Sequence, residues 1–165
     1  MAMNMTLLRV LALVTLSMMQ REASKPVRVT APGYDGAIIS ADAQIQSDPR
    51  HLLTANQVWT PTEADVREAE KLLAEYVNSR DAEIRLRGTR IRAELARYKR
   101  QYWGVIRGGR RSMLISFYHE DTAAAQKELW LRRIISVMGG GDQFFRVTYH
   151  MQERRFDSLQ ANASE

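Results

Sequence analysis

YKRQYWGVIR-GG-RRSMLISFY, residues 98–118, is the stretch that decides the fold. Apolar residues recur with a period of two on both sides of Gly108-Gly109, which is the spacing of two strands. Glycine takes a positive φ at both central positions of a two-residue turn at little cost. The stretch therefore predicts an antiparallel hairpin whose strands cover residues 98–107 and 110–118.

A second hairpin is expected downstream. Residues 131–138 and 143–150 are apolar runs on either side of Gly139-Gly140-Gly141-Asp142. Residues 155–161 alternate weakly and predict a short last strand or a tail. A phosphate-binding loop is disfavoured at the glycines, because the Lys-Ser/Thr pair of such loops is missing and a strand follows.

One helix is predicted upstream of the hairpins. In Trp59-Thr60-Pro61-Thr62-Glu63, Thr60 can cap a helix that starts at Pro61, and Glu63 completes a capping box. Apolar residues then recur every three or four positions up to about Asn78, which gives the helix one apolar face. The predicted fold is an α+β roll: one long N-terminal helix packed on a curved four-stranded antiparallel meander.

The rest of the chain predicts a leader, an arm and a tail. Residues 7–19 form a 13-residue apolar segment, too short for a membrane-spanning helix and typical of a signal peptide. An amphipathic or buried N-terminal helix is the alternative. We expect a signal peptide at 1–23, a flexible arm at 24–58, the α+β domain at 59–162, a tail at 163–165, and a periplasmic or secreted location with no transmembrane span in the mature chain.

Composition limits the chemistry. The 165 residues include no cysteine, which excludes disulfides, thiolate metal sites and cysteine nucleophiles. The net charge is +5, and its excess is concentrated in residues 80–111, which hold 11 basic and 3 acidic residues. We therefore expect a local basic surface.

A series of motifs lies along the second part of the chain: Trp59-Thr60-Pro61, Tyr98 to Val105, Arg107 to Arg111, Gly139-Gly140-Gly141, Phe145 to Tyr149, and Phe156 through Leu159 to Asn162. With these motifs the chain resembles a group of small exported bacterial proteins of uncharacterised function over about residues 59–162. This resemblance implies a signal or lipoprotein leader and a helix wrapped by a curved antiparallel sheet, similar to cystatin-like folds, and it transfers no catalytic residue. The chain departs from the group after Tyr149, where His150 to Arg154 replace an Asp and a glycine-containing turn.

Two sets of candidate binding residues follow. The first set interleaves aromatic and basic residues on the predicted hairpin, although strand alternation assigns at least one aromatic set to the core. It consists of Arg100, Tyr102, Arg107, Arg110 and Arg111. The second set is a possible polar pocket. It consists of His119, Asp142, Tyr149 and His150.

Neither set predicts a reaction. His119-Glu120-Asp121 has the donor types of a metal or acid–base site, but adjacent strand residues point to opposite faces, which favours a solvated strand end. His150 would add to it only if it lay beside His119 across the sheet. We expect no catalytic residue, no metal and no cofactor.

Three functions stay open on the sequence. The first is a non-catalytic exported domain that binds a protein or an anionic envelope component through its sheet and basic hairpin. The second is a small-ligand pocket or enzyme at the open end of the roll. The third is nucleic-acid binding through the arginine-rich hairpin, which export makes unlikely as a partner class. The sequence does not indicate an oligomeric state.

Overall fold

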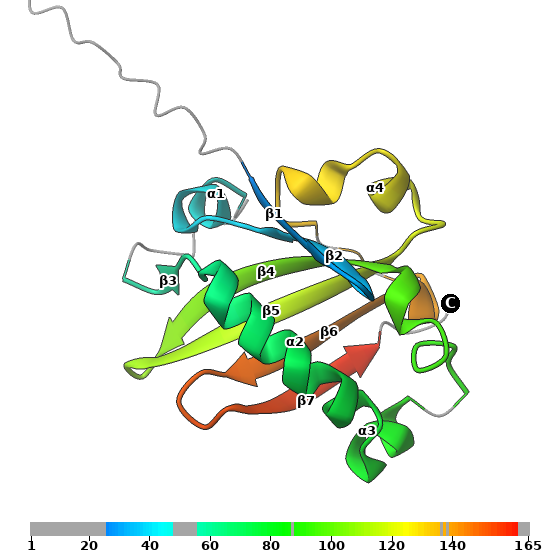
Figure 1. The fold of residues 1–165 in the computed structure, drawn as a ribbon. Coiled ribbons are helices and arrows are strands. Elements are labelled where there is room, and N and C mark those ends of the chain that lie inside the picture. Colours follow the sequence, from blue (N-terminus) through cyan, green and yellow to red (C-terminus); the bar gives the residue numbers. More distant parts are fainter. Residues whose placement is uncertain (1–25, 48–55, 87, 136, 138, 162–165) are drawn as a thin grey trace, which may run out of the picture.

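The computed structural model describes residues 26–47, 56–86, 88–135, 137 and 139–161 (Figure 1). The predicted signal peptide at 1–23 and the tail at 163–165 lie outside these residues. The elements, in chain order, are β1 (Val27–Ala31), β2 (Tyr34–Ile38), α1 (Ala41–Ser47), β3 (Val58–Trp59), α2 (Glu63–Val77), α3 (Arg80–Arg85), η1 (Leu95–Arg97), β4 (Tyr98–Arg107), β5 (Arg110–His119), α4 (Ala123–Gln126), η2 (Leu129–Leu131), η3 (Gly141–Gln143), β6 (Phe144–His150) and β7 (Arg155–Ala161).

The strands form one mixed seven-stranded sheet. Its order is β1-β2-β4-β5-β6-β7, with β3 paired to β4 beside this path. The β2–β4 pair is parallel, with Asp35 opposite Lys99 and Ile38 opposite Tyr102. The other pairs are antiparallel. The predicted fold, a long N-terminal helix on a four-stranded antiparallel meander, is therefore wrong.

The physical reason for this error lies before Trp59. Part of the segment interpreted as an arm, residues 27–38, is a hairpin that turns at Gly33 and extends the sheet past β4. Asp35 holds this hairpin in place, because its carboxylate accepts hydrogen bonds from Arg28 in β1 and Lys99 in β4. A parallel pair of strands separated by some 60 residues leaves no mark in local periodicity.

The central hairpin is as predicted. β4 and β5 pair from Tyr98–His119 to Arg107–Arg110, so Gly108 and Gly109 form the turn, both with positive φ. The alternation of β4 buries side chains on both faces of the sheet. Tyr98 and Tyr102 belong to the core on one face, and Trp103 and Val105 to the core on the other.

Helix α2 covers the first face, and Figure 1 shows it lying across the strands. Its buried stripe is Val66, Ala69, Leu73 and Val77. The capping box is displaced by two residues from the prediction: the hydroxyl of Thr62 accepts the Asp65 N–H, and the Asp65 carboxylate accepts the Thr62 N–H at 2.8 Å. Thr60 instead contacts the start of α1, where its hydroxyl accepts the Ala41 N–H at 2.9 Å.

The opposite side, here called the back face, carries a second core around Trp103 and Trp130. The segment after α4 packs on it without forming a strand in the residues described between 131 and 137, so the predicted strand at 131–138 is wrong. Its place beside β5 is taken by β6, which pairs with β5 from Ser112–His150 to Tyr118–Phe144. The predicted last strand is present as β7. No helix among the described residues is long and apolar enough to cross a membrane.

Candidate functional site

Two of the five predicted surface residues are buried. Arg100 is 2% exposed and Tyr102 is fully buried under α2. Both contact the same carboxylate oxygen of Glu70, the guanidinium at 3.3 Å and the tyrosine hydroxyl at 2.9 Å. Arg100 also lies over the rings of Tyr34 and Phe117. These two residues belong to the core and are not available to a partner.

The other three lie at the exposed end of the central hairpin. Arg111 points to the α2 side, where its guanidinium lies 5.3 Å from the centre of the Trp59 ring. Arg107 and Arg110 belong to the back face. Arg110 is ion-paired with Glu153 at 3.2 Å, whereas no acidic partner of Arg107 is found among the residues described.

Arg107 and Arg110 border a hollow of about 240 Å³, which we call the hairpin hollow. Strands β4 to β7 and the β6–β7 turn contribute to it, and Val105 and Leu114 supply its apolar part. Its remaining members are polar or charged. They are Arg107, Arg110, Ser112, Thr148, His150, Glu153, Arg155, Asp157 and Ser158.

Three of these side chains form a hydrogen-bonded series across neighbouring strands. Ser112 Oγ lies 3.2 Å from His150 Nδ1, and His150 Nε2 lies 2.7 Å from Asp157 Oδ2. Burial by itself would raise the pKa of Asp157, but hydrogen bonds from His150 and Ser158 and nearby positive charge outweigh it and lower the pKa. Asp157 is therefore held ionised and oriented toward the histidine.

The series has the residue types of a nucleophilic triad, but its setting does not suit one. A serine nucleophile needs nearby N–H groups aimed at the oxyanion that forms. Ser112 lies within a strand that is paired on both sides, with Val105 and with His150. The N–H groups around it belong to the sheet ladders, so we interpret the series as a polar border of the hollow.

The predicted polar pocket does not exist as one site. His119 and Asp142 lie at the far end of β5, where His119 Nε2 is 2.9 Å from Glu94 and the Tyr98 hydroxyl donates to the Asp142 carbonyl at 2.8 Å. Burial raises the pKa of Tyr98 to about 12. Tyr149 and His150 lie at the other end of the sheet, because Ser112, seven residues from His119 along β5, is the partner of His150.

Tyr149 and His150, although adjacent in sequence, point to opposite faces of the sheet. Tyr149 points to the α2 side and donates to Glu68 at 3.2 Å, whereas His150 points to the back face. His119 contacts Asp121 at 3.2 Å in addition to Glu94. Within the described ranges, no group of three or more His, Asp or Glu side chains could hold a metal ion.

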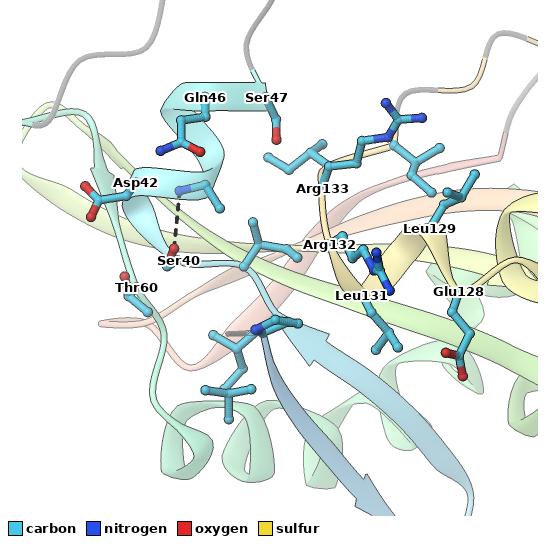
Figure 2. A pocket seen from close by; sticks show the side chains of 17 residues that line it. Ser40, Asp42, Gln46, Ser47, Thr60, Glu128, Leu129, Leu131, Arg132 and Arg133 are labelled. Carbon is cyan, nitrogen blue, oxygen red and sulfur yellow. Dashed lines mark hydrogen bonds between the residues drawn. The ribbon is translucent and has the colours of Figure 1, made fainter. Parts of the chain in front are cut away.

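A larger cleft lies on the back face and had no signal in the sequence. It measures about 1260 Å³ and separates α1 from the segment 128–135 (Figure 2). Its walls come from residues about 90 positions apart, within a segment interpreted as an arm and another interpreted as a strand. Periodicity cannot place two such segments side by side.

No protein-family model, curated protein or solved structure matches this chain.

Proposed function

We propose that this chain is an exported, non-catalytic binding domain that holds an anionic component of the cell envelope in the hairpin hollow. The observation that carries the proposal is the placement of Arg107, Arg110 and Arg155 around one concave site. Guanidinium groups donate paired hydrogen bonds to phosphate and carboxylate oxygens.

The hollow has more arginines than carboxylates: Arg107, Arg110 and Arg155 face Glu153 and Asp157. Its two carboxylates are already engaged, Glu153 by Arg110 at 3.2 Å, and Asp157 by His150 at 2.7 Å and Arg155 at 3.5 Å. Arg107 is exposed and has no acidic partner in the described part of the chain. An incoming anion would meet Arg107 first.

The other residues suit such a ligand. Ser112 and Thr148 supply hydroxyl groups that can donate to an oxyanion. Val105 and Leu114 supply apolar surface beside them and are 7% and 8% exposed. A phosphate or carboxylate attached to a carbon skeleton would match both the charged border and the apolar part.

Export is the second half of the proposal. It is supported by the apolar segment at residues 7–19 and by the resemblance to small exported proteins. An exported domain would meet its ligand in the cell envelope. Expression of the full chain with a C-terminal tag, followed by cell fractionation, tests it. A periplasmic species shorter by about 20–25 residues is expected, and a full-length cytosolic product would overturn this half.

Binding is tested with vesicles of phosphatidylglycerol and phosphatidylcholine, with phosphatidylcholine vesicles as the uncharged control. Each of the three arginines contributes about 1 kcal/mol near an anionic surface, so the triple variant R107Q/R110Q/R155Q should bind about 100-fold more weakly. The matched control is R67Q/R85Q/R92Q, which removes the same charge from the side of α2 and α3. Equal loss in both variants would show a non-specific charge effect and would contradict the hollow as the site.

Nucleic acid is less well supported as the ligand. Proteins that bind single strands stack the bases on exposed aromatic rings. Tyr98 and Tyr102 are fully buried, and Trp103 is 9% exposed beneath the guanidinium of Arg146. Binding of a single-stranded oligonucleotide that is stronger than binding to anionic vesicles would favour this alternative.

A further inference from the structure

The cleft on the back face is distinct from the hairpin hollow and shares no residue with it. One wall is α1 with the two residues before it, and the other is the segment 128–135, as Figure 2 shows. Val27, at the start of β1, also lines the cleft and is 45% exposed. In the described part of the molecule, Ile84 is the other large apolar residue that is this exposed.

The first wall is fixed by a buried glutamine. Gln44 on α1 is fully buried, and its amide nitrogen donates to the carbonyls of Ile39 at 3.1 Å and Trp59 at 3.0 Å. These bonds tie α1 to the end of β2 and to β3. A helix of seven residues is not stable by itself, so this attachment holds it in place.

The second wall is fixed by another buried glutamine. The amide nitrogen of Gln101 on β4 donates to the carbonyls of Trp130 and Arg133, the latter at 2.6 Å. Its oxygen accepts the Ile135 N–H and the Tyr118 hydroxyl. All four hydrogen-bonding positions of this side chain are used, and three of them hold the backbone of the wall. The cleft is thus preformed.

The lining combines aliphatic groups with two arginines, Arg132 and Arg133, and two carboxylates, Asp42 on the first wall and Glu128 at the start of the second. Its apolar members are Val27, Ile38, Ile39, Ala43, Leu129, Leu131, Ile134 and Ile135. Arg132 and Arg133 are exposed, lie on the second wall, and have no ion pair among the residues that the structure describes (Figure 2). The carboxylate of Glu128, in contrast, lies within electrostatic reach of Arg28.

We propose that this cleft binds an anionic amphiphile, a molecule with an unbranched aliphatic chain and a carboxylate headgroup. The chain packs on the isoleucines and leucines between the two walls, where it is removed from water. The headgroup pairs with Arg132 and Arg133 through charge-assisted hydrogen bonds. The proposal does not depend on the anion site of the hairpin hollow.

Calorimetric titration of the purified full chain with dodecanoate, below the concentration at which it forms micelles, tests this site. Dodecanoate should bind more tightly than dodecanol, and dodecyltrimethylammonium should bind least. The variant R132Q/R133Q should weaken dodecanoate binding about tenfold and leave dodecanol binding unchanged. The control R85Q/R92Q removes the same charge outside the cleft and should leave both unchanged.

A second variant tests the apolar part and the place of binding. V27N changes an exposed side chain, so the fold should tolerate it, and it should weaken dodecanoate and dodecanol equally. R107Q/R110Q/R155Q should retain dodecanoate binding, which separates this site from the hairpin hollow. Absence of dodecanoate binding, equal binding of the cationic amphiphile, or an unchanged affinity in R132Q/R133Q would overturn the proposal.

Discussion

The guanidinium Nε of Arg100 lies 3.3 Å from Oε1 of Glu70, and the two side chains are 2% and 8% exposed. This ion pair connects β4 to α2 through the core. The arginine also donates to the carbonyls of Gly33 and Leu95, at 3.2 and 3.4 Å. One side chain therefore joins the central strand to the covering helix, to the β1–β2 turn and to η1.

Replacement of this arginine should be among the most damaging single changes in the chain. R100A leaves the Glu70 carboxylate buried without its cation, and we expect the free energy of unfolding to fall by about 3–5 kcal/mol. Urea denaturation followed by circular dichroism measures it. The matched control R92A, at an exposed arginine, should change the value by less than about 0.5 kcal/mol. A small effect of R100A would show that the carboxylate is solvated in the folded protein.

The same pair predicts a pH dependence. Burial raises the pKa of Glu70 above its ordinary value of 4.5, and the nearby Arg100 and the Tyr102 hydroxyl offset this only in part. Between 4.5 and the raised pKa, the folded state binds a proton that the unfolded state has released. The stability of the wild type relative to E70Q should therefore fall as the pH rises through this window. Urea titrations at stepped pH measure the difference, and a rise with pH would mean that Arg100 outweighs burial.

For Asp35 we expect the opposite pH dependence: its contribution to stability should increase as the pH rises. Burial would raise its pKa, but hydrogen bonds and charges from Arg28 and Lys99 outweigh it and lower the pKa below 3.8. D35N should lower the free energy of unfolding by about 1–2 kcal/mol at neutral pH. This value is kept small because Arg28 is half-exposed, and solvent weakens its ion pair with Asp35. The difference from the wild type should shrink as the pH falls from 3.8 through the lowered pKa of Asp35, because the unfolded state takes up a proton there before the folded state does. Hydrogen exchange of the backbone amides of β1 and β2 should become faster in D35N. Faster exchange in β6 and β7 alone would contradict the role of Asp35 in holding the β1–β2 hairpin on β4.

Gly104 should not tolerate a side chain. A Cβ at this position would lie 2.5 Å from the indole Cε2 and from the carbonyl oxygen of Trp59. G104A should therefore displace β3 and cost at least about 1–3 kcal/mol. In thermal unfolding, the double variant G104A/W59L should lose less than the sum of the two single losses, because a smaller side chain relieves part of the clash. Additive losses would show that the two sites do not touch.

The central hairpin could be predicted because its information is local. Alternation over residues 98–107 and two glycines determine both the register and the turn, and the alternation also indicated that aromatic side chains of this strand enter a core. A helix from Pro61 to about Asn78 was predicted for the same reason; the structure has it at Glu63–Val77, and its cap is Thr62 and not Thr60. Both threonines precede an acidic residue by three positions, so the sequence alone does not choose between them.

The sheet edge and the sites could not be predicted, because they depend on contacts between distant segments. The parallel pairing of β2 with β4 leaves no repeat in the sequence. Residues 131–138 have the pattern of a strand, but the apolar residues described there, Leu131, Ile134, Ile135 and Val137, pack against the core of Trp103 and Tyr118 as a covering segment. His150 was identified as a candidate, but its partners Ser112 and Asp157 were not. Only the cross-strand register brings them together.

The parallel strand pair also sets an order of events during folding. Asp35 meets Lys99 across 64 residues, whereas β4 and β5 meet across a two-residue turn. Loop closure over the longer distance costs more entropy and is slower, so β4 and β5 can pair first and offer the edge on which β2 docks. Although β1 and β2 leave the ribosome first and can pair with each other, β2 has no edge on which to dock until β4 has been made.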